Sequence, residues 1–133
     1  MWKRRRRRGR QPDTSVPVEL CDLCAAVFPK DRAVRGYVRD SSAVHPEHDG
    51  DDGLRLVTAC GDDHFDTIAE GYRHRPFVSE ELWAAKVSRA LTTGPTGLTM
   101  QQLAWQTGLL EPQIRRGIAW HNQRMRQGQD LDP

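Results

Sequence analysis

The order of apolar and polar residues predicts strands in the first half of the chain. Two short β-branched segments, Val34–Val38 and Leu54–Thr58, flank a polar loop, Asp40–Gly53. Such segments, separated by Gly, Asp and Ser, are typical of strands joined in a hairpin. Gly61–Tyr72 then begins with acidic residues, which complement a helix dipole, and a helix is expected there. The apolar side chains of this helix are Phe65, Ile68, Ala69 and Tyr72.

Beyond Pro76 the pattern predicts three helices. The first, Ser79–Leu91, starts with a serine that can cap it. The second, Thr99–Thr107, opens with the capping-box pair Thr99 and Gln102 and ends before Gly108. The third begins near Pro112, which suits a first helical turn, and runs to about Gln127. The expected apolar faces are Trp83, Val87, Ala90 and Leu91 in the first helix, and Ile114, Ile118, His121 and Met125 in the third; Trp105, Trp120 and Met125 are expected in the core or at an interface.

The distribution of charge separates three regions that the near-neutral total conceals. The 133 residues include 20 Lys and Arg against 18 Asp and Glu, a formal charge of +2. Residues 1–10 carry +7, residues 11–70 carry −8 and residues 71–127 carry +5. No apolar run is long enough to span a membrane, and none follows the first arginines as a signal peptide requires. We therefore expect neither a membrane protein nor a secreted one.

Three cysteines and one histidine have the spacing of a metal site. Cys21 and Cys24 form a Cys-x2-Cys pair, and His64 follows Cys60 by four residues. Thiolates of a Cys-x2-Cys turn converge on one point, and residues four apart share a helix face, so the two pairs can complete a tetrahedral site. We predict one structural Zn²⁺, because this segment has too few large apolar side chains to fold alone. The competitors for the fourth ligand position are His45, His48 and Asp63.

The segment from Val44 to His64 resembles the HNH endonuclease pattern. With the cysteine knuckle, the hairpin and ligands from a helix start, residues 19–70 are similar to treble-clef zinc proteins. The resemblance implies that His45 activates water and that His64, as the last His, holds a catalytic divalent metal. Three positions depart from the family pattern: Arg55 replaces the central Asn, Val44 replaces an acidic residue, and Asp63 replaces the fourth zinc cysteine.

These departures predict a non-catalytic relative of the nucleases, because the groups that would touch the reacting phosphate are missing. If His64 is the fourth zinc ligand, it cannot also bind a catalytic ion. The only nuclease candidate is then His45 as general base. The acidic loop residues Glu47, Asp49, Asp51 and Asp52 either hold Mg²⁺ or form a solvated face.

Residues 99–118 resemble a helix-turn-helix. Ala104 is small where two helices would cross, Gly108 supplies the turn, and Ile114 is an aliphatic anchor. These residue types permit close packing and a left-handed turn at low cost. Side chains that read base edges or bind phosphate would come from the third helix, and they are Gln113, Arg115, Arg116 and Arg124, with Arg126 further along. A helical bundle that binds a protein partner fits the same pattern.

The Arg-rich start of the chain is expected to be a solvated tail that binds polyanions. Its arginines can pair with phosphates, an attraction that weakens with salt. An anionic membrane leaflet or a purely solubilising role are the alternatives. Without a lipidation signal or an apolar anchor, nucleic acid is favoured over membrane. The tail residues assigned to nucleic acid are Arg4, Arg5, Arg6, Arg7 and Arg8.

Together these patterns predict an α+β fold, in which a small treble-clef-like zinc module (knuckle, β-hairpin, helix) precedes a three-helix helix-turn-helix-like bundle. The expected divisions are a disordered tail at 1–16, the zinc module at 17–76, the bundle at 77–127 and a second tail at 128–133. The expected function is zinc-stabilised binding of duplex DNA in transcription regulation or an accessory role, in the cytoplasm at the nucleoid. The alternatives are an HNH-type nuclease and an interaction module that binds a protein through the acidic zinc module or the exposed helices.

Overall fold

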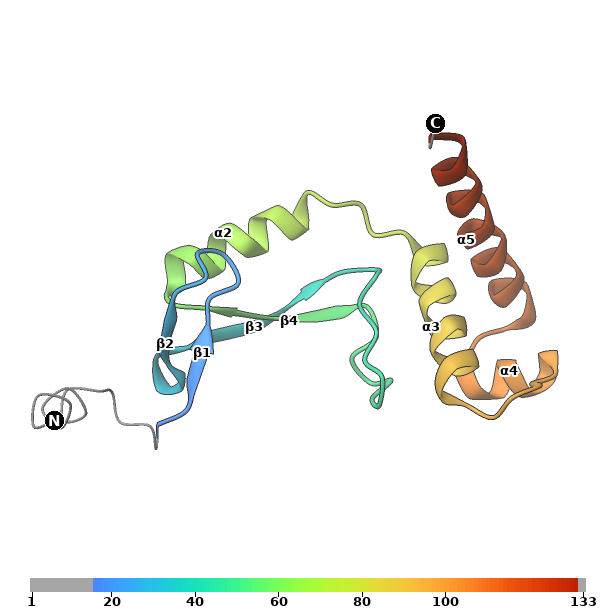
Figure 1. Ribbon diagram of the computed structural model, residues 1–133, viewed down its shortest axis with the longest axis horizontal. Coiled ribbons are helices and arrows are strands. Elements are labelled where there is room, and N and C mark those ends of the chain that lie inside the picture. Colours follow the sequence, from blue (N-terminus) through green and yellow to red (C-terminus); the bar gives the residue numbers. More distant parts are fainter. Residues whose placement is uncertain (1–15, 132–133) are drawn as a thin grey trace, which may run out of the picture. The chain divides into compact units, whose positions relative to one another are not determined.

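The computed structural model describes residues 16–131 and has a mixed α+β fold (Figure 1). Two antiparallel hairpins come first and four α-helices follow, which confirms the predicted fold class. Within this part of the chain, no helix is long and apolar enough to cross a membrane. In chain order the elements are β1 (Val18–Leu20), β2 (Val27–Pro29), the 3-10 helix η1 (Lys30–Arg32), β3 (Val34–Arg39), β4 (Leu54–Ala59), α2 (Asp62–Arg73), α3 (Ser79–Thr93), α4 (Met100–Thr107) and α5 (Glu111–Leu131).

Backbone contacts divide the chain into two compact units. The first contains the described residues up to Gly36 together with Val57–Glu70, and the second contains Tyr37–Leu56 and the residues from Gly71 onward. The loop that joins β3 to β4 therefore counts with the helices of the second unit. The domain limits expected from sequence stay predictions.

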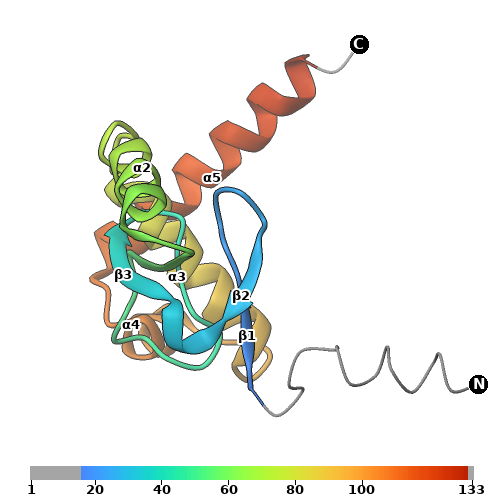
Figure 2. The ribbon, with the colours of Figure 1, turned by 90° about the vertical axis from the view of Figure 1, so that its left-hand side faces the viewer.

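The first unit starts with a short hairpin that the sequence pattern did not predict. β1 and β2 form this hairpin (Figure 2). They pair antiparallel, with Glu19 opposite Phe28. The turn between them holds the first cysteine pair. The Cys21 N–H donates to the Ala26 carbonyl at 2.9 Å, and Ala25 has a positive φ of 61°. Strands of three residues are too short to display an alternating pattern.

The apolar core of the first unit is small. Cys21, Phe28 and Ala59 are buried, and Phe65 of α2 packs against them. A Cβ atom at Gly36 of β3 would lie 2.6 Å from the Phe65 ring, so only glycine leaves room for this ring on the strand. The predicted apolar face of α2 is thus used at Phe65, but the buried set is too small to stabilise a fold by itself.

The three C-terminal helices enclose their own core. α4 begins with the predicted capping box, in which Thr99 and Gln102 exchange hydrogen bonds, and it ends at Gly108 with φ of 71°. Ile114 of α5 is fully buried, as the anchor position predicts. α5 also crosses α3 closely, because a Cβ atom at Gly117 would lie 2.8 Å from the backbone nitrogen of Ala84. The buried members of this core are Val87, Ala90, Leu103, Leu109 and Ile114.

Three expectations about these helices are wrong. Ser79 is the first residue of α3 and not its cap, and the N-cap residue Val78 makes no side-chain bond. Leu91, expected on the apolar face of α3, is 55% exposed. Trp105 was expected in the core or at an interface, and its 88% exposure excludes only the core. The predicted stripe of α5 is buried only at Ile114, and Ile118 and Met125 are exposed along a helix that continues to Leu131.

Candidate metal centre

The structure brings the four predicted zinc ligands together in the first unit. The ligand atoms of Cys21, Cys24, Cys60 and His64 all lie within 4.8 Å of one another. The Cys24 and Cys60 sulfurs are 3.9 Å apart, and the His64 Nδ1 lies 3.2 Å from the Cys60 sulfur. Nδ1 also lies 3.7 Å from the sulfur of Cys21. Cys21 is buried, Cys24 is exposed, and the other two ligands are half-buried.

Short secondary-structure elements hold each ligand in place. Cys21 follows β1, Cys60 follows β4, and His64 lies in the first turn of α2. Two reciprocal bonds connect the cysteine turn to β4: the Asp22 N–H donates to the Thr58 carbonyl at 2.9 Å, and the Thr58 N–H donates to the Asp22 carboxylate at 2.8 Å. The turn and the strand are therefore joined beside the ligands. Asp22 is a supporting residue that sequence reasoning missed, although its place inside the Cys-x2-Cys pair is a signal for it.

These distances fit a tetrahedral metal ion. With bonds of about 2.3 Å to sulfur and about 2.0 Å to nitrogen, Zn²⁺ places neighbouring ligand atoms about 3.5–3.8 Å apart. The three separations of 3.2, 3.7 and 3.9 Å lie close to this range, and all three cysteines are free rather than joined by a disulfide. Four protein ligands leave no open coordination position. Such a site stabilises a fold and does not activate water.

The thiols have opposed acidities. The backbone N–H of Cys24 lowers the pKa of Cys21 to about 5, although burial acts against it. Burial raises the pKa of Cys60 to about 11, and its contacts with Cys21 and Cys24 add to this increase. The turn therefore stabilises the negative charge of a Cys21 thiolate. Removing the proton of Cys60 beside it is unfavourable. A divalent cation supplies the positive charge that this group of ligands needs.

The competitors for the fourth ligand position are not part of this cluster. Asp63 precedes His64 in α2, but only His64 joins the cysteines. His45 and His48 belong to the second unit, where their ring centroids lie 4.7 Å apart. Within residues 16–131, no other group of three or more His, Cys, Asp or Glu side chains could hold an ion.

The loop histidines line a pocket of about 400 Å³ together with Tyr37 and Arg55. The Nδ1 of His45 accepts the Glu47 N–H at 3.1 Å, so the neutral ring carries its proton on Nε2. In that tautomer neither ring nitrogen is free to accept a proton from water. Arg55 stands where the HNH pattern has Asn, and its Nε donates to the buried Asp40 at 2.6 Å.

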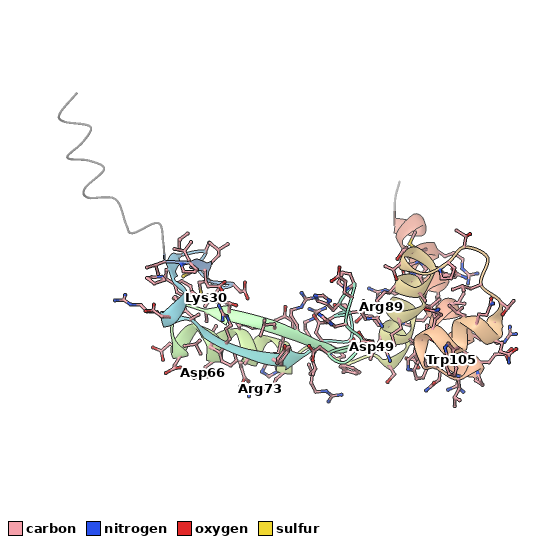
Figure 3. All side chains as sticks on the ribbon, turned by 90° about the horizontal axis from the view of Figure 1, so that it is seen from below. Lys30, Asp49, Asp66, Arg73, Arg89 and Trp105 are labelled. Carbon is pink, nitrogen blue, oxygen red and sulfur yellow. The ribbon has the colours of Figure 1, made fainter. Side chains whose placement is uncertain are left out.

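The acidic loop is not a uniformly solvated face. The side chain of Asp52 is only 4% exposed, and both of its carboxylate oxygens accept hydrogen bonds from Arg89 of α3, at 2.6 and 2.7 Å. Arg89 also donates to the His45 carbonyl at 3.0 Å. Hydrogen bonds to Asp52 raise the pKa of Arg89, and the charge of Asp49 adds to this effect; Figure 3 labels both Asp49 and Arg89. The loop is thereby joined to α3, and both carboxylate oxygens of Asp52 are paired with a guanidinium.

The predicted nucleic-acid side chains of α5 differ in their availability. The Gln113 side-chain oxygen accepts a hydrogen bond from the Leu110 N–H at 2.9 Å, and this bond stabilises the N-terminus of α5. Arg115 pairs with Glu111 at 2.7 Å, and Arg116 is exposed. The Arg124 guanidinium lies 5.4 Å from the centre of the Trp120 ring. The tail arginines, Arg4 to Arg8, lie outside the described residues.

Arg126, which was expected further along the same helix, belongs with these side chains. Arg126 follows Arg115 by eleven residues, or about three helical turns, so both lie on the same exposed side of α5. Arg116 lies beside Arg115 on this side, opposite the buried Ile114 and Gly117. Helical spacing thus adds Arg126 to the side of α5 on which Arg115 and Arg116 lie.

The chain matches none of the protein-family models, curated proteins or solved structures with which it was compared. The similarity to HNH and helix-turn-helix proteins therefore depends on the residues and geometry described above.

Proposed function

We propose that this protein is a zinc-stabilised DNA-binding protein with a regulatory or accessory role. The observation that carries the proposal is the exposed side of α5, on which Arg115, Arg116 and Arg126 lie together. Guanidinium groups bind phosphates and can also bind guanine edges in the major groove. The Arg-rich residues 1–10 add sequence-independent attraction to the same polyanion.

The geometry before α5 supports this role. A capped α4, a left-handed Gly108 and a buried Ile114 are the features that a helix-turn-helix needs to present its second helix to DNA. Ion pairing with Glu111 orients the side chain of Arg115 but also competes with phosphate. The exposed Arg116 has no such competitor among the described contacts and is therefore the better probe.

In this proposal the metal has a structural role. Cys21, Cys24, Cys60 and His64 would hold Zn²⁺, which supplies on the order of 10 kcal/mol to a unit with little apolar core. Residues 11–70 carry −8, so we assign them no contact with phosphates. They serve as a scaffold or as a surface for a protein partner.

A salt-dependent titration of the full chain on specific and random duplexes tests the proposal. Arg116→Ala is expected to weaken binding and to lower the slope of log affinity against log salt by about 1 if Arg116 contacts phosphate. Arg32→Ala, an exposed arginine outside α5, is the matched control and should change little. Deleting residues 1–10 should weaken binding to all sequences. Absence of affinity in the full chain, or equal effects of both alanine variants, would contradict the role of α5.

A metal-dependent nuclease is the second candidate function, because His45 and His48 line a pocket with Arg55. Two observations argue against this function: the Nδ1 of His45 already accepts a hydrogen bond, and His64 lies with the three cysteines. Incubating DNA with micromolar protein in Mg²⁺ or Mn²⁺ tests it. Cleavage that His45→Ala removes would support this function, and intact DNA would eliminate it.

A further inference from the structure

A long uncharged segment crosses the second unit. Residues 90–110 contain no Asp, Glu, Lys, Arg or His, although 29% of the chain is charged. At that average, about six charged residues are expected in a segment of this length. The segment includes the whole of α4 and the turns on both sides of it. Its surface is therefore electrically neutral, unlike the acidic and basic regions elsewhere.

This neutral segment presents both a projecting aromatic ring and an apolar groove. Trp105, labelled in Figure 3, is 88% exposed on α4. The groove beside it has a volume of about 540 Å³. We call this region the Trp105 surface; it is lined by Pro95, Leu98, Gln101, Gln102, Ala104, Trp105 and Gln106. Large aromatic side chains that remain exposed in this way mark interfaces, because their burial stabilises a complex strongly.

We propose that the Trp105 surface binds a second copy of the same chain. In a two-fold symmetric dimer, every residue near the axis meets its own copy, so like charges there repel each other. The Trp105 surface avoids this repulsion because it has no charged residue at all. It also carries the projecting ring and the groove side by side, so the indole of each copy can enter the groove of the other.

Other occupants fit this surface less well. DNA needs positive charge for its phosphates, and the groove lining offers none. A charged protein partner would gain no ion pair there. The glutamine side chains at the rim can donate and accept hydrogen bonds, so two identical rims can pair with each other. This inference does not depend on DNA binding by α5.

Sedimentation equilibrium of the full zinc-loaded chain, without DNA, tests the dimer. We expect monomer and dimer to exchange within about 1–200 µM, the range of a modest interface. Trp105→Glu should raise the dimer dissociation constant by about 30-fold or more, since it removes the anchor and places two carboxylates near each other. Circular dichroism should remain unchanged, because this side chain lies outside the core.

Met125→Glu is the matched control, since Met125 is an exposed apolar residue of α5 outside the neutral segment. Its dimer dissociation constant should stay within about twofold of the unchanged chain. A chain that stays monomeric over the whole range overturns the proposal. So does a Trp105→Glu variant that dimerises as the unchanged chain does, or a Met125→Glu variant that loses the dimer equally.

Discussion

Cys60 is one of the four residues of the candidate metal site and lies against the small core of the first unit. Because serine is a poor zinc ligand, Cys60→Ser should lower the zinc content well below one ion per chain and unfold this unit. Elemental analysis after gel filtration and amide NMR spectra would measure both effects. Asp63→Asn, next to His64 but outside the cluster, should keep its zinc. Full zinc content in the serine variant would contradict the assignment.

Asp40 is a buried carboxylate whose charge is stabilised by its neighbours. Burial alone would raise the pKa of Asp40, but hydrogen bonds from Ser42 and from Arg55 outweigh it and hold the pKa below its ordinary value. A lowered pKa stabilises the fold above the unfolded pKa of about 3.9, and this stabilisation is lost as the pH falls through the folded pKa.

Asp40→Asn should therefore reduce the free energy of unfolding by about 1–3 kcal/mol at neutral pH. The difference from the unchanged chain should stay constant down to about pH 5 and shrink below about pH 4. Thermal unfolding of the second unit at several pH values measures it. A gap that stays constant into strong acid would show that the charge of Asp40 is not the stabilising group.

At this scale, some residues were predictable and others were not. Sequence spacing could indicate the two ligand pairs, Cys21 with Cys24 and Cys60 with His64, because the two members of each pair are close in sequence. The bond between Asp52 and Arg89 joins residues 37 apart with no shared motif. No periodic pattern reports such a pairing, so the acidic loop was predicted only as solvated or magnesium-binding.

At the scale of elements, the crossing of α3 and α5 depends on one glycine. Gly117→Ala should destabilise the second unit by about 1–3 kcal/mol, because its Cβ atom would lie 2.8 Å from the α3 backbone. The same change at Gly128 of α5 meets nothing within 4 Å and should be neutral or stabilising by about 0.5–1 kcal/mol. Urea unfolding of the two variants gives this comparison. Equal stabilities would contradict the close crossing.

The sequence predicted correctly those elements whose ends are marked by residues close together in the chain. The capping box set the start of α4 correctly, because Thr99 and Gln102 bond within one turn. The β1–β2 hairpin escaped prediction because its strands are short and depend on the cysteine turn. For Trp105 the sequence left a core and an interface position open, since an aromatic residue on a helix gives the same pattern in both cases.

At the scale of the whole molecule, the two units should respond differently to removal of metal. The core of α3, α4 and α5 contains no cysteine, whereas the core of the first unit includes Cys21 and packs against Cys60. A chelator should therefore abolish the dispersed amide signals of the first unit while most helical ellipticity remains. Restoring Zn²⁺ should bring the signals back. Loss of all helical signal on chelation would contradict independent stability of the second unit.

The fold class was predictable because strand-like and helical patterns occupy separate halves of the chain. The sequence did not predict that the β3–β4 loop belongs to the second unit, since the loop lies between the two ligand pairs in sequence. The loop is bonded to Arg89 of α3 through Asp52. A long-range ion pair of this kind cannot be predicted from hydrophobic periodicity. The uneven charge of the three regions indicates which parts can meet a polyanion, whereas the total of +2 does not.

The reciprocal bonds between Asp22 and Thr58 have a kinetic consequence. When an ion leaves one ligand pair, these bonds keep the cysteine turn beside β4, so both pairs stay close enough to recapture it. For the ion to escape, the two Asp22–Thr58 hydrogen bonds must break while the ligands are also released from the ion. Exchange of the ion with the surroundings should accordingly be slow, and a cell could dilute its free zinc without emptying the site.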